Sequence, residues 1–115
     1  MLPLKAQSPI GLEVVVTVDR PKGSHHLDYP DLLYEVNYGY AEGVPAADGE
    51  WQDAYILGVS EPIECFTGQV IAVIHRRDDI ETKWVVAAAG CRFSLEEIQK
   101  QTHFQEKYFD TWIEL

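Results

Sequence analysis

The fold is indicated first by the stretch Leu12-Glu13-Val14-Val15-Val16-Thr17-Val18. Its β-branched residues favour an extended chain, so the run predicts a first strand, largely buried, that ends at Asp19. The next stretch, residues 20–31, is dense in proline, glycine and aspartate. It predicts a loop, because each proline removes an amide donor and biases the residue before it away from helix.

Working outward along the chain, four more segments have the composition of strands. They are the loosely alternating Leu33–Tyr40, then Asp53–Val59, Gln69–Arg76 and Thr82–Ala88. Five short strands are a common sheet size, and followed by one helix they predict a mainly β fold, a small barrel with a C-terminal helix packed on it.

The helix is predicted from about Leu95 to Phe109. Ser94 precedes it and Glu97 follows three residues later, the pattern in which each side chain satisfies the free backbone amide of the other residue. At 100° per residue, Leu95, Ile98, Thr102 and Phe109 fall on one side with Tyr108 on the flank. We expect this side to lie against the sheet.

Length and composition bound the class of protein. The 115 residues predict a single domain, residues 1–115, without an apolar run near the length of a membrane span. The start, Met1 to Lys5, lacks the pattern of a secretory signal, so we expect a cytoplasmic protein without a membrane partner. The net charge of -10 opposes binding to a nucleic-acid backbone. Cys65 and Cys91 stand outside any metal or redox spacing and predict two reduced, buried thiols.

Two acidic clusters carry the chemistry of the sequence. The first contains Asp48, Glu50 and Asp53, and the second contains Asp78, Asp79 and Glu81 just before Lys83. Carboxylates are the ligands that hard divalent cations select, and several carboxylates on one wall repel one another without a cation between them. Either cluster alone is also an ordinary turn, since Asp-Gly is a turn dipeptide and Asp-Asp can cap a hairpin. Together they favour magnesium chemistry on phosphate.

At the level of motifs, the chain resembles the soluble family I inorganic pyrophosphatases. The resemblance rests on four segments in the family's order: Asn37-Tyr38-Gly39-Tyr40, then Asp48-Gly49-Glu50 with Asp53, then Asp78 to Lys83, and Phe104-Gln105-Glu106-Lys107-Tyr108. It implies a barrel of the oligonucleotide/oligosaccharide-binding type (OB-like), with magnesium-dependent hydrolysis of pyrophosphate to two phosphates.

The resemblance also implies roles for individual residues. Metal ligands are expected at Asp48, Asp53, Asp78 and Glu81, with Asp79 as the alternative to Asp78. Glu50 replaces the aspartate that the family places beside the attacking water, where a shift of roughly 1 Å can cost on the order of a hundredfold in rate. Lys83 is expected to contact phosphate, and Tyr38 and Tyr108 to direct hydroxyls at phosphate or metal-bound water. Asp19 stands where the family has a glutamate near the metals.

Two departures concern positive charge. The family carries a lysine, a glutamate and an arginine on a hairpin that residues 22–31 replace, and Phe109 stands where the family has a lysine. Arg20, Lys22 and Arg76 are the expected substitutes for binding the substrate. Further candidates are His25, His26, His75 and Arg77, although the adjacent histidines read more readily as loop surface.

Three functions are therefore weighed. The first is magnesium-dependent hydrolysis of inorganic pyrophosphate. The second is a pyrophosphatase homologue with weak or lost diphosphatase activity that binds or hydrolyses another phosphate compound. The third, a nucleic-acid module, is suggested only by the barrel type and opposed by the acidity. A homo-oligomer is expected, because the family usually assembles and a small barrel benefits from a covered edge.

Overall fold

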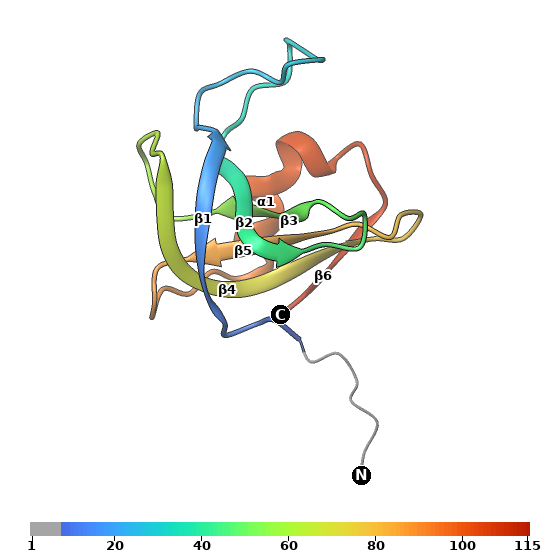
Figure 1. Cartoon of the computed structure of the whole chain (residues 1–115). Helices are drawn as coiled ribbons and strands as arrows, with labels where there is room; N and C mark the ends of the chain where they lie inside the picture. Colours follow the sequence, from blue (N-terminus) through green and yellow to red (C-terminus); the bar gives the residue numbers. More distant parts are fainter. Residues whose placement is uncertain (1–7) are drawn as a thin grey trace.

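A computed structural model describes residues 8–115, so the start of the chain, where we expect no secretory signal, lies outside the described residues. The barrel strands are β1 (Glu13–Arg20), β2 (Asn37–Pro45), β3 (Trp51–Ile56), β4 (Cys65–Arg76) and β5 (Thr82–Ala87), followed by helix α1 (Leu95–Glu106) and strand β6 (Thr111–Glu114) (Figure 1).

Five strands close the barrel in the order β1-β2-β3-β5-β4, with β4 pairing back onto β1. Strand β4 makes the closure possible because it is 12 residues long: its first half pairs with β1, and its second half pairs with β6 on the same edge. Strands β3 and β5 are the one parallel pair among the described strands. The predicted five-stranded barrel with one helix is confirmed.

Several details differ from the sequence-based expectation. The loop before β2 extends to Val36, and α1 ends at Glu106 instead of Phe109. Strand β1 is half buried, since Val14 and Val16 point inward while the residue between them is exposed. Strand β6 was not predicted, because its four residues are too few to show a period.

The buried residues form two clusters. Val16, Ala54, Ile56, Val70 and Val86 belong to a cluster to which all five barrel strands contribute, and which fills the barrel. Neighbouring side chains on a strand point to opposite faces of the sheet. The strand residues next to those that fill the barrel therefore point outward and contribute to the second cluster.

The second cluster lies under α1. It joins Tyr55 and Leu57 to Ile98 and Phe104 of the helix and to Tyr34 of the loop before β2. The helix and this loop therefore cover the same face of the barrel.

The helix begins as predicted. Ser94 accepts the backbone N–H of Glu97, and the Glu97 side chain accepts the N–H of Ser94. Ile98 and Thr102 are buried as expected, whereas Leu95 is 40% exposed. Contrary to our expectation, Phe109 and Tyr108 do not belong to this helical face, because both residues follow the end of the helix.

The two cysteines are free thiols, but both are exposed, so the prediction of buried thiols is wrong. Each lies at a boundary of regular structure, where burial is incomplete: Cys65 begins β4 and Cys91 lies in the turn before α1. Helix α1 is too short and too polar to cross a membrane, and no other helix is described in residues 8–115.

Gly39 lets β1 and β2 approach each other. A methyl group at this position would lie 1.8 Å from the backbone oxygen of Thr17, so the strands would have to separate. We predict that Gly39→Ala lowers the free energy of unfolding by about 3 kcal/mol, measured by urea denaturation. Gly43→Ala on the same strand is the control, because its methyl group meets open space and only its positive φ costs about 1 kcal/mol. Equal losses in the two variants would contradict the argument.

Candidate active site

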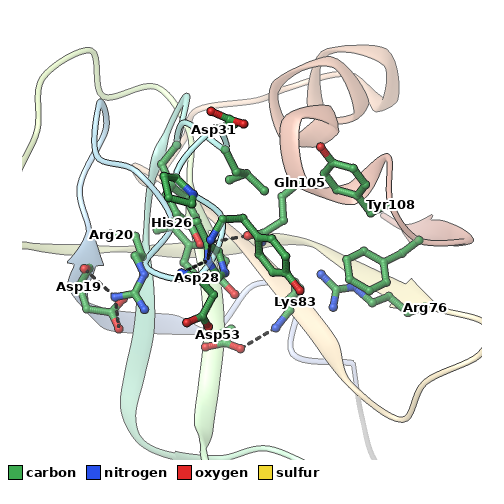
Figure 2. Close-up of a pocket in the computed structure, with 16 residues that line it drawn as sticks. Asp19, Arg20, His26, Asp28, Asp31, Asp53, Arg76, Lys83, Gln105 and Tyr108 are labelled. Carbon is green, nitrogen blue, oxygen red and sulfur yellow. Dashed lines mark hydrogen bonds and ion pairs between the residues drawn. The ribbon is translucent and has the colours of Figure 1, made fainter.

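A cavity of about 870 Å³ lies where the site loop (residues 21–36, between β1 and β2) meets the strands and the segment after α1. Figure 2 shows its polar lining. Four aspartates and three cationic side chains face it: Asp19, Asp28, Asp31, Asp53, Arg20, Arg76 and Lys83. Eight of the residues that the sequence analysis named as candidates meet here, namely Asp19, Arg20, His26, Tyr38, Asp53, Arg76, Lys83 and Tyr108.

The pair of Asp53 and Lys83 forms the centre of the cavity. Ala54 of β3 pairs with Trp84 of the parallel strand β5, so the residues just before them lie side by side. The Lys83 Nζ atom donates to Asp53 Oδ2 at 2.6 Å, and the lysine side chain is only 6% exposed. The ammonium group is thus held inside the site by a carboxylate.

Glu81 and Asp48 extend this pair toward the barrel rim. Glu81 Oε2 lies 3.6 Å from Lys83 Nζ, and the Glu81 carboxyl hydrogen-bonds the carboxyl of Asp48. The neighbouring Asp48 carboxyl raises the pKa of Glu81, whereas the Glu81 carboxyl and the backbone N–H of Glu50 lower the pKa of Asp48. Three of the four predicted metal ligands therefore gather around Lys83.

The remaining predictions fall outside the cavity. Asp78 is exposed in the β4–β5 turn, where its alternative Asp79 accepts the backbone N–H of Glu81. Glu50 is exposed in the β2–β3 turn, donates its backbone N–H to Asp48 and is not among the residues that line the cavity. Lys22 also does not line the cavity; its backbone N–H donates to Asn37.

Tyr38 and Tyr108 differ in environment although both line the cavity. Burial raises the pKa of Tyr38 well above its usual value, and the charge of Asp53 adds to this effect, so the phenol stays protonated and can donate. Tyr108 is 65% exposed and lies at the rim. Arg20 completes the rim, with its Nη1 atom 3.7 Å from Asp19 Oδ2.

The third cation, Arg76, is held by a residue that sequence reasoning missed. Its Nε and Nη2 atoms donate to the two carboxylate oxygens of Glu106 at 3.1 and 2.8 Å. Glu106 also accepts from the Tyr55 hydroxyl, which itself accepts from Gln105. The Phe109 ring covers the guanidinium at 3.6 Å. Arg76 is thus a buried, paired group and less available to a substrate than we expected.

A signal for Glu106 and Gln105 was present in the sequence. They follow Ile98 and Thr102 at the spacing that keeps residues on one helical face, yet they are polar. A polar residue on a buried face requires a partner, and this could have drawn attention to them.

The donor set fits a divalent cation in part. Among residues 8–115, no three acidic, histidine or cysteine side chains converge on one point. The carboxyl groups of Asp48 and Glu81 lie close together, and neighbouring carboxylates are ligands that a hard cation selects. Asp53 could join such a cation only by leaving Lys83. The described residues therefore offer a hard cation two carboxylates, those of Asp48 and Glu81.

The buried pair of Arg76 and Glu106 gives a direct test of stability. We predict that Arg76→Met lowers the free energy of unfolding by about 3–5 kcal/mol, because it leaves Glu106 buried without its partner. Arg77→Met is the matched control. Its ion pair with Asp110, 3.3 Å long, is exposed and should change stability by no more than about 0.5 kcal/mol. Thermal and urea unfolding measure both, and similar losses would contradict the assignment.

Comparison with known proteins yields structural neighbours only. No protein-family model matches the sequence, and no curated protein matches it. Among solved structures, the inorganic pyrophosphatase of Ehrlichia chaffeensis superposes with a TM-score of 0.69 at 13% identity, over 96% of this chain and 90% of the other. The enzyme of Neisseria gonorrhoeae gives 0.65 at 19% identity, over 85% and 74% of the two chains.

A third inorganic pyrophosphatase, from Coxiella burnetii, superposes with a TM-score of 0.60 at 16% identity, over 96% of this chain and 87% of the other. All three likenesses extend over most of both chains, so they concern the whole barrel and its helix. The fold of this chain is therefore the fold of the inorganic pyrophosphatases.

Proposed function

We propose that this protein hydrolyses inorganic pyrophosphate, or a closely related phosphoanhydride, with the help of Mg²⁺. The observation that carries the proposal is the cavity that collects Asp53, Lys83, Arg20 and Tyr38, with Glu81 and Asp48 beside it, on a pyrophosphatase fold. Carboxylates for a cation and cations for a phosphate lie within reach of one another.

The charge of the cavity supports a role for a metal. Four aspartates outnumber three cationic side chains in the lining, so the cavity alone cannot neutralise a diphosphate anion. An anion of this kind needs added positive charge. We infer that pyrophosphate binds together with Mg²⁺ and that Asp48, Glu81 and Asp53 would hold the cation. The bound cation would supply a Lewis acid and would make a water molecule more acidic.

The chain's own residues have separate tasks in this proposal. Lys83 and Arg20 contact phosphoryl oxygens and stabilise the charge on the leaving phosphate, and the protonated Tyr38 hydroxyl donates a hydrogen bond. Glu50 lies outside the cavity, so we assign the acceptance of a proton from water to Asp19. Although the Asp19 side chain is 46% exposed, partial burial raises its pKa, which suits a base better than a fully solvated carboxylate.

The test is phosphate release from pyrophosphate by the purified chain, with and without Mg²⁺. We predict that Asp53→Asn and Lys83→Met each lower kcat by about a hundredfold or more, because each removes a charge at the reacting centre. Glu42→Gln on β2, at a residue that is exposed and does not line the cavity, should keep the wild-type rate. Absence of magnesium-dependent release from the wild type would refute the proposal.

A second candidate rests on the 2.6 Å contact between Lys83 and Asp53. Because this lysine neutralises a carboxylate that a metal would need, the chain could bind a phosphate compound while hydrolysing it weakly or not at all. Calorimetric binding of phosphate compounds with Mg²⁺ present, without release of phosphate, would favour this candidate over the first.

A further inference from the structure

His26 is held in a fixed position by the backbone of the site loop. Its own N–H donates to the carbonyl of Leu32 at 2.9 Å, and nearby the N–H of Tyr34 donates to the carbonyl of Ser24 at 2.8 Å. The imidazole lies near two aromatic rings, with centroid separations of 5.1 Å to Tyr29 and 6.3 Å to Tyr34. The ring is therefore placed by the fold.

Hydrogen bonds fix which nitrogen of His26 carries the proton. The Nδ1 atom accepts the backbone N–H of Asp28 at 3.0 Å and that of Tyr29 at 3.2 Å. A nitrogen can accept only through its lone pair, so Nδ1 bears no proton. In the neutral ring the proton then lies on Nε2, which becomes a donor.

The Nε2 atom of His26 is not buried. No hydrogen bond from Nε2 to another part of the described chain is found, and no buried polar side-chain atom of residues 8–115 lacks a partner, so Nε2 is reachable by solvent. His26 lines the same cavity as Lys83 and Arg20, and in the view of Figure 2 it lies above Asp53. The free donor therefore belongs to a side chain that lines the space a substrate would occupy.

We propose that His26 is a substrate-binding residue whose Nε2–H donates a hydrogen bond to a phosphoryl oxygen of a diphosphate. This inference deepens the proposed function and rests on the cavity being a phosphate site. Lys83 is paired with Asp53, Arg76 with Glu106 and Arg20 with Asp19. A phosphoryl oxygen can take the His26 donor without breaking an ion pair, so His26 is a first point of contact.

Binding of methylenediphosphonate, a diphosphate that cannot be hydrolysed, tests the inference in the presence of Mg²⁺. His26→Asn keeps an oxygen near the position of Nδ1 for the loop amides but removes the Nε2 donor. We expect it to weaken binding about tenfold by calorimetry, the loss typical of one hydrogen bond to a charged group. His25→Asn is the matched control, because His25 is exposed, does not line the cavity and contacts the Pro30 carbonyl through Nδ1.

Nitrogen-15 NMR of the wild-type histidine rings gives a readout that does not depend on a variant that folds. The inference requires that the His26 proton be on Nε2 and that the Nε2 resonance shift when methylenediphosphonate is added. A proton on Nδ1, an unmoved resonance, equal affinities of His26→Asn and wild type, or no binding by the wild type would each overturn it.

These outcomes are separable from those of the proposed function. Diphosphonate binding that depends on His26, without phosphate release from pyrophosphate, would refute the hydrolase and keep the role of His26. Phosphate release whose KM and kcat are both unchanged by His26→Asn would support the hydrolase and refute the role of His26.

Discussion

The buried ion pair of Arg76 and Glu106 is the constraint on which the site depends. It joins the end of β4 to the last residue of α1, and the Tyr55 hydroxyl on β3 donates to the same carboxylate. Two charges inside a protein are tolerated only when each is paired and hydrogen-bonded, so three elements must meet in one arrangement. The site loop then packs on this assembly through the hydrogen bond from Tyr34 to Gln105.

Cationic side chains that line the cavity are likewise paired with carboxylates. Lys83 is matched by Asp53, and Arg20 is matched by Asp19. Binding an anion here is therefore an exchange of partners and not the filling of a positive pocket. Lys83 is free to meet a phosphoryl oxygen only when another positive charge takes over Asp53. Under the proposed function, cation and phosphate would consequently bind together, each strengthening the binding of the other.

Much of the fold and part of the site could be read from the sequence, because local patterns determine them. The β-branched runs gave the five barrel strands, and Ser94 with Glu97 gave the start of α1. The motif residues that lie within strands, Asp53 and Lys83, met as expected because strand pairing fixes their neighbours. Glu50 and Asp78 lie in turns, where the number of residues and the backbone hydrogen bonds decide the direction of a side chain, and no periodicity reports this.

The remaining features depend on contacts between segments far apart in the sequence. Nothing local shows that Glu106 meets Arg76, since 30 positions separate them. The adjacent residues His25 and His26 look equivalent in sequence, yet one contacts the Pro30 carbonyl outside the cavity and the other lines it. Neighbouring side chains of an extended segment point to opposite sides, so the register of the loop decides which histidine can reach a ligand. Under the proposed function, this register fixes which loop side chain can meet a phosphate.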